Sequence, residues 1–193
     1  MKKSLVMATL VVASTSMMAM DLQYFLGAGA TRVDANLNEK GSLSNGVQTI
    51  SFNDSYDFKD TALSLKAGII LDKTHRISLS HTKFSKDDTD ARNILGSYDY
   101  LIPLKEEFRL YAGLHAGNTK VEVDGDSASG LAYGAQVGAI YDITKNIEFE
   151  LGLAYSKYNV DKSYNGTIGT LSYDYKVELE DSTSMFAGIN YKF

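Results

Sequence analysis

Hydrophobic and polar residues alternate along the last ten positions of the chain. The hydrophobic set is Met185, Ala187, Ile189, Tyr191 and Phe193. The positions between them are small or polar, namely Ser184, Gly188, Asn190 and Lys192, with Phe186 as the exception. Successive side chains of a β-strand point to opposite faces, so this period of two predicts a strand with two different faces.

Seven earlier segments repeat the same alternation. With the last ten residues they predict eight strands, at residues 22–31, 62–71, 76–82, 94–102, 108–117, 132–142, 147–156 and 184–193. After residue 19 the chain has no run of about 18 apolar residues that could form a membrane-spanning helix. A closed barrel is the other structure that satisfies every backbone group in lipid.

Glycine and charge gather on one face of these strands, opposite the bulky hydrophobic residues. The glycines of this face are Gly27, Gly29, Gly68, Gly113, Gly117, Gly134, Gly138, Gly152 and Gly188. A soluble barrel needs bulk inside to fill its core, whereas a narrow membrane barrel needs small residues inside and bulk outside. The pattern favours an all-β, eight-stranded antiparallel up-and-down transmembrane β-barrel over a soluble barrel.

The first 19 residues have the features of a cleaved signal peptide. Lys2 and Lys3 form a basic start, and a short apolar stretch follows at residues 5–13. That stretch is too short for a membrane anchor, which needs about 20 apolar residues. We expect cleavage near Ala19, although Met17 fits poorly at the third position before the cut, and a barrel domain over residues 20–193.

Composition narrows the class of protein further. Without the two lysines of the leader, 17 basic residues face 24 acidic ones, which argues against binding of nucleic acid. The chain has no cysteine, so disulfides, lipoprotein acylation and thiolate metal sites are excluded. One proline, 16 glycines and 13 tyrosines suit long strands with aromatic girdles better than a helical protein.

The connections between the predicted strands alternate in length. Residues 72–74, 103–107 and 143–146 form short links, and the longer links surround Asn45, Asp88, Gly125 and Gly166. In outer-membrane barrels the short turns face the periplasm and the long loops face outside. An even strand count then leaves both termini in the periplasm.

Some of the long loops contain turn signals of their own. Asn45–Gly46 predicts a tight hairpin turn, toward which the first two strands continue above the membrane. Asp124–Gly125 could close the fifth and sixth strands in the same way, and Asn165–Gly166 and Gly169 compete as the tip between the seventh and eighth. The alternating series Tyr173, Tyr175, Val177 and Leu179 predicts a protruding strand there. Disordered loops are the alternative.

Residues 111–117, 130–142, 146–155 and 188–193 give the chain a resemblance to a known family. It resembles the small outer-membrane β-barrels that include the OmpA transmembrane domain, OmpX and the opacity proteins. The resemblance implies export by the secretory pathway to the cell outer membrane, with outer-membrane lipid and lipopolysaccharide as surroundings. It also implies that Ile189, Tyr191 and Phe193 are the terminal signal that the barrel assembly machinery reads, besides being lipid-facing residues.

Charged residues on the inward face form a candidate network in the lumen. They are Lys66, Arg76, Asp99, Arg109, Asp142, Glu148, Glu150 and Lys192. Opposite charges in a narrow lumen can compensate each other, whereas an unpaired charge there is costly. The structural interpretation is a plug of salt bridges, and the functional one is a gated narrow pore. Eight strands leave an interior about filled by side chains, which favours the plug.

The sequence gives little support for a catalytic or a metal site. His81 lies near the outer end of its strand beside Ser80, but neighbours in a strand point to opposite faces and cannot form a nucleophile–base pair. His115 is expected in the lumen and His75 at a periplasmic turn. No two histidines have metal-ligand spacing. The acidic loop at residues 87–90 lacks the glycine and distal glutamate of a calcium loop.

The sequence therefore predicts a monomeric, non-enzymatic outer-membrane protein without cofactor or metal. Its barrel would anchor outer loops that serve envelope integrity or surface interaction, with an extracellular ligand that the sequence does not identify. A narrow porin-like channel for small solutes is the alternative, and a lipid A-modifying enzyme is a third hypothesis.

Overall fold

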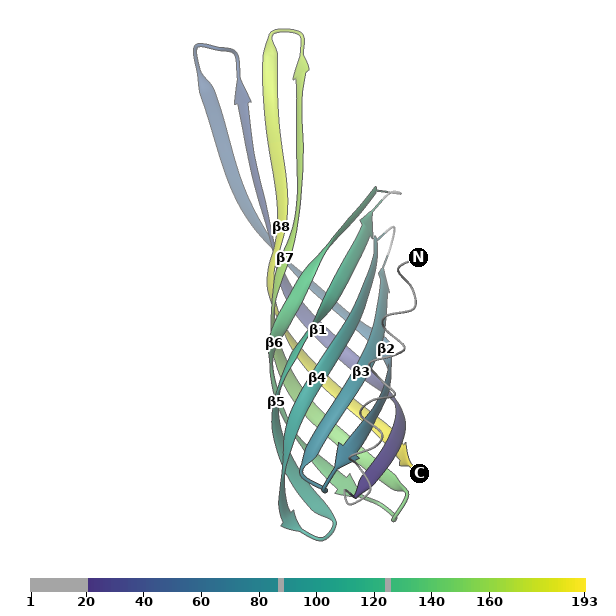
Figure 1. Ribbon diagram of the computed structural model, residues 1–193. Coiled ribbons are helices and arrows are strands. Elements are labelled where there is room, and N and C mark those ends of the chain that lie inside the picture. Colours follow the sequence, from purple (N-terminus) through teal and green to yellow (C-terminus); the bar gives the residue numbers. More distant parts are fainter. Residues whose placement is uncertain (1–20, 87–88, 124–125) are drawn as a thin grey trace, which may run out of the picture.

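The computed structural model describes residues 21–86, 89–123 and 126–193, which form a closed antiparallel barrel (Figure 1). The strands are β1 (Leu22–Ser44), β2 (Thr49–Leu71), β3 (His75–Lys86), β4 (Thr89–Lys105), β5 (Phe108–Val123), β6 (Asp126–Asp142), β7 (Ile147–Ile168) and β8 (Leu171–Lys192). Each strand pairs with the next, and β8 pairs with β1 to close the ring. The prediction of eight antiparallel strands is confirmed. No helix among the described residues is long and apolar enough to cross a membrane.

The strands are longer than the alternating segments indicated. The expected link at residues 103–107 is mostly strand, because β4 continues to Lys105 and leaves only two residues before β5. Its pairing with β5 is irregular between Pro103 and Lys105, where the proline lacks the N–H that a regular ladder needs. At the other end of the sequence, Phe193 lies just beyond β8, and its N–H donates to the carbonyl oxygen of Tyr24 at 3.0 Å.

Four strands rise well above the rest of the barrel. Residues 37–56 of β1 and β2 and residues 160–179 of β7 and β8 form a sheet with the order β2–β1–β8–β7, which we call the blade. The two hairpins of the blade stand above β3 to β6 in Figure 1. The pairing shifts between Asn36 and Leu37 and between Lys157 and Val160. Such bulges bend and twist a strand, and these two lie where the blade leaves the barrel.

Glycines form both tips of the blade. The Asn45–Gly46 turn is confirmed: Gly46 has φ 81°, and the side-chain oxygen of Asn45 accepts the N–H groups of Val47 and Gln48 at 2.9 and 2.7 Å. The other tip is at Gly169, with φ 65°, between Ile168 and Leu171. Asn165–Gly166, the competing tip, is part of β7 instead. The predicted turn at Asp124–Gly125 and the predicted leader lie outside the described residues.

The two faces of the strands match the alternation. Outward aliphatic side chains are well exposed, such as Leu63 at 81 % and Leu114 at 66 %. Inward side chains are buried even when they are charged, with Arg76 and Glu148 at 0 % exposure. Glycine makes room for them: a Cβ at Gly138 would lie 2.3 Å from the Leu151 carbonyl oxygen and 2.5 Å from the Tyr111 hydroxyl.

Gly138→Val should therefore destabilise the barrel. The added side chain would collide with backbone that cannot move away, and overpacking of this kind costs about 3 kcal/mol. Urea unfolding in lipid vesicles measures the loss in the free energy of unfolding. Ala135→Val, on the outward face of the same strand, is the matched control and should change little. Equal stability of the two variants would contradict this packing.

Candidate functional site: the barrel lumen and the blade

The lumen of the lower barrel, near the short turns, holds a first cluster of charged side chains. Arg76 of β3 donates to Asp99 of β4 and to Glu150 of β7, both at 2.8 Å. Lys66 of β2 reaches the same Glu150 at 3.0 Å. These contacts cross the lumen from β2 and β3 to β7, so the cluster ties opposite walls of the barrel together. It brings together four of the eight charged residues that the sequence singled out.

A second cluster contains the other four. Arg109 of β5 donates to Asp142 and Glu148, at 2.8 Å each. Lys192 of β8 contacts the same Asp142 and lies 3.6 Å from Glu148. Asp142 and Glu148 are partners across the short turn between β6 and β7. The two clusters together contain four cations and four anions, so their formal charges cancel.

Two uncharged amides connect the network, and charge-based reasoning missed them. The side chain of Asn190 donates to Glu148 at 2.9 Å and to Glu150 at 3.0 Å, which joins the two clusters. Gln136 donates to Asp99 at 2.6 Å. Both positions lie on the inward face of the alternation, and that face is the signal that could have identified them.

An apolar layer fills the space around the network. It consists of Phe25, Ile70, Leu101, Tyr111 and Ile140, all at most 2 % exposed, with Phe186 packed against them. The Arg76 guanidinium lies over the Tyr111 ring, 4.5 Å from its centroid. Such stacking is favourable when the cation is removed from water. Side chains from all eight strands thus occupy the lower lumen.

The three histidines lie in different settings. His115 is buried, and its Nε2 lies 2.9 Å from the Ser156 hydroxyl, but its Nδ1 has no hydrogen-bond partner there. A Ser–His pair needs a third group to orient the imidazole, so this pair is incomplete. His75 contacts the Tyr98 hydroxyl, and His81 is exposed on the outward face. The described residues contain no group of three or more metal ligands.

The residues of the proposed assembly signal lie on the outward face near the short turns. Ile189, Tyr191 and Phe193 are all exposed. The rings of Tyr191 and Phe193 meet edge to face, with centroids 5.1 Å apart. This position suits an aromatic girdle at the membrane boundary, and the role in assembly stays a prediction.

The blade has a mostly apolar inner face that continues the lumen-facing positions of the barrel, with one charged row formed by Asp54, Glu39 and Lys162. Phe52, Gly41, Tyr175 and Tyr164 lie opposite one another across its four strands. Tyr175 is 6.3 Å from Phe52 and from Tyr164, measured between ring centroids. A Cβ at Gly41 would lie 2.1 Å from the Phe52 ring, so the glycine lets the ring extend across β1. Ile50 and Leu43 extend this face toward the tip and are exposed.

The outer face of the blade is polar. Lys40 lies 3.0 Å from Glu178, and Lys176 contacts the same carboxylate. Hydrogen bonds from Lys176 and Lys40 hold the pKa of Glu178 below its usual value. On the inner face, burial and a hydrogen bond to Glu39 raise the pKa of Tyr175 to about 12. The charges of both groups therefore stay the same throughout the neutral pH range.

Comparison with known proteins identifies the fold. No family model matches the sequence, and no curated protein sequence matches it. Among solved structures, the chain is similar to OprG from Pseudomonas aeruginosa, with TM-score 0.64, 16% identity and coverage of 89% of this chain and 95% of that one. The Neisserial surface protein NspA gives TM-score 0.57 and 16% identity, with coverage of 88% and 97%. OprH from P. aeruginosa gives TM-score 0.55 and 25% identity, with coverage of 87% of this chain and 99% of that one. The chain has the fold of the small outer-membrane β-barrels.

The barrel's outward aliphatic residues therefore face lipid, and the charged network lies at membrane depth. There, every charge must find its partner within the protein, because lipid offers none. The neutral sum of the network meets this requirement.

Arg76→Met should destabilise the barrel strongly, since it leaves Asp99 and Glu150 short of a cation in the lumen. Removal of one partner of a buried ion pair costs about 4 kcal/mol. Urea unfolding in lipid vesicles measures the effect. Arg92→Met removes the same charge from an exposed position and should cost less than about 1 kcal/mol.

A second substitution makes this test specific to charge balance. Arg76→Met combined with Asp99→Asn restores the neutral sum, leaves Lys66 paired with Glu150, and should recover part of the lost stability. The prediction is wrong if Arg76→Met costs no more than Arg92→Met.

Proposed function

We propose that this protein is a non-enzymatic outer-membrane anchor that presents the blade at the cell surface for interaction with another surface. The observation that carries the proposal is the combination of a filled lower lumen with a four-stranded sheet whose apolar inner face is exposed. Exposed apolar area of this kind is typical of interaction sites. The blade extends the barrel wall directly, because β1, β2, β7 and β8 are continuous from one to the other.

The filled lumen supports an anchor rather than a channel. The network and the apolar layer around it take side chains from every strand, and three buried cations and the partly buried Lys66 are held by four anions. An open pore would require several of these contacts to break at once. Breaking any of them leaves a buried charge without its partner, which is costly.

The orientation of the barrel also follows from loop length. The three short turns lie at the end opposite the blade, as Figure 1 shows. In outer-membrane barrels short turns face the periplasm, so the blade would face outside. The chain lacks cysteine, so single introduced cysteines can test this arrangement on intact cells.

The purified barrel should leave planar lipid bilayers at their baseline conductance. The reason is that ion pairs and packed side chains occupy the lower lumen. Reproducible single-channel steps, absent from preparations of an unrelated closed barrel, would favour the narrow channel instead.

Cells that display the protein should lose attachment to a polystyrene surface when Phe52→Ser and Tyr175→Ser are combined, because these changes remove the aromatic row of the inner face. The matched control is the pair Lys40→Ser and Lys176→Ser on the outer face, which should attach as the wild type does. Ser51→Cys, labelled on intact cells with an impermeant maleimide, verifies display of each variant. Lys145→Cys at a short turn should stay unlabelled.

Equal attachment by both pairs of variants, with equal display, would contradict a role for the inner face. Labelling of Lys145→Cys rather than Ser51→Cys on intact cells would contradict the proposed orientation.

A further inference from the structure

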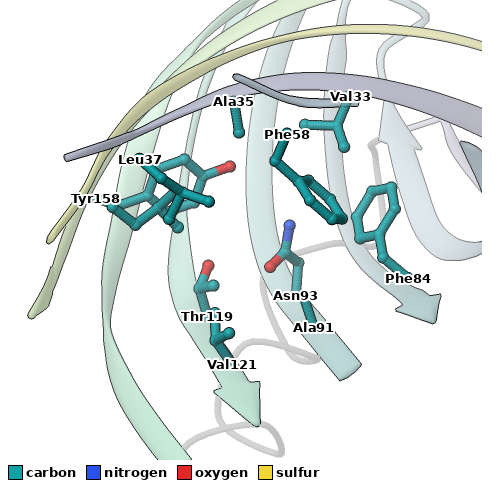
Figure 2. Close-up of a pocket in the computed structure, with 11 residues that line it drawn as sticks. Val33, Ala35, Leu37, Phe58, Phe84, Ala91, Asn93, Thr119, Val121 and Tyr158 are labelled. Carbon is teal, nitrogen blue, oxygen red and sulfur yellow. The ribbon is translucent and has the colours of Figure 1, made fainter. Parts of the chain in front are cut away.

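Above the charged network, at the level where the blade begins, the side chains that line the lumen are apolar instead of charged. Eleven uncharged side chains surround a cavity of about 70 Å³ that is open toward the blade. Its walls are nearly all apolar, with Val33, Phe58, Phe84 and Val121 among them (Figure 2). We call this cavity the collar. An apolar collar above a charged plug is not needed to close the barrel, because the plug already does so.

Three polar side chains interrupt the apolar wall, and one of them, Tyr158, already has its hydroxyl 2.8 Å from that of Ser182. The other two lack such a partner in the described part of the chain. Asn93 of β4 and Thr119 of β5 are partners across the ladder. Figure 2 shows their polar ends directed into the space between the labelled side chains. Thr119 is only 2 % exposed, and neither its Oγ1 nor the Oδ1 of Asn93 has a hydrogen-bond partner among the described residues. An unsatisfied buried group of this kind costs about 2 kcal/mol of folding free energy. Two such groups in one cavity therefore indicate a bound molecule that hydrogen-bonds to them.

The place of this pair within the collar fixes the orientation of a ligand. Asn93 lines the collar and also a second cavity beneath it, which is lined by the hydroxyls of Ser64 and Thr82 and by Lys66. The pair therefore forms the floor of the collar. Leu37 and Leu179 line its upper part and also form the first row of the blade. A ligand would place its polar end on the floor and its apolar body toward the mouth.

The chemistry of the floor selects the polar group. Asn93 Oδ1 accepts a hydrogen bond, and the Thr119 hydroxyl can donate one. A single alcohol hydroxyl satisfies both, because it donates to the first and accepts from the second. A carboxylate or ammonium group would enter an apolar cavity without a charged partner, since none of the lining side chains is charged.

We propose that the collar binds an uncharged molecule with a short alkyl chain and one hydroxyl group. The cavity is smaller than the roughly 150 Å³ that accommodates benzene in an engineered protein cavity. It therefore holds the hydroxyl end and the first carbons of the chain, while the rest of the chain lies against Leu37 and Leu179 at the mouth. This site is independent of the surface interaction proposed above, which does not use Asn93 or Thr119.

The test uses the full barrel in lipid nanodiscs without detergent, with ¹³C-labelled valine methyl groups. Hexan-1-ol should shift the methyl signals of Val33 and Val121 in a saturable manner. The lipid-facing Val137 reports partition into the bilayer and should shift without saturation. Hexanoate and hexylammonium at pH 7 should cause no saturable shift at Val33 or Val121.

Two variants connect the binding to the collar. Thr119→Val keeps the shape but removes the hydroxyl, and it should weaken hexan-1-ol binding about fivefold, as expected for one hydrogen bond. Ala91→Phe fills the collar and should abolish the saturable shifts, whereas Ala135→Phe on the outward face should not. Heat-modifiable gel mobility verifies that each variant is folded.

The proposal is overturned if hexan-1-ol gives no saturable shift at Val33, since the collar then holds water only. It is also overturned if Thr119→Val binds as tightly as the wild type, or if hexanoate binds as well as the alcohol. If Ala91→Phe fails to fold, the affinity of Thr119→Val for hexan-1-ol still tests the proposal on its own.

Discussion

Charge cancellation inside the lumen is the constraint on which the rest of this barrel depends. Eight ionised side chains lie at membrane depth, where neither lipid nor bulk water can stabilise an unpaired charge. They are stable because four cations and four anions meet within hydrogen-bond distance, with Asn190 and Gln136 completing the set. Inward glycines such as Gly138 leave room for these long side chains, and β8 must close against β1 for Lys66 of β2 to reach Glu150 of β7.

Much of the fold could be predicted from the sequence, because the alternation of side chains along a strand is local. In β7, Glu148 and Glu150 alternate with Phe149 and Leu151, and this alone assigns the first pair to the lumen and the second to lipid. The same alternation indicated every charged residue of the network. It could not indicate which charges meet, because Lys66 and Glu150 are 84 positions apart and the contact depends on closure of the ring.

Other features depend on contacts between distant residues and could not be predicted. The tip at Gly169 prevails over Asn165–Gly166 because the pairing of Ile168 with Leu171 continues the ladder with β8. The aromatic row of the blade needs Gly41 of β1 to face both Phe52 and Tyr175, a match of register across three strands. The collar is also assembled from several strands, and Thr119 and Asn93 have no distinguishing signal in the sequence.

The most direct test of the central claim is to measure whether each side of one strand faces lipid or the lumen. Single cysteines at positions 133–139 of β6, carrying spin labels, can be examined in lipid vesicles with oxygen and with a water-soluble nickel complex as relaxation agents. Labels at Tyr133, Ala135, Val137 and Ala139 should respond to oxygen and be protected from nickel, with a period of two along the strand. Strong nickel accessibility at these outward positions would contradict the assignment of the apolar face to lipid and the charged face to a closed lumen.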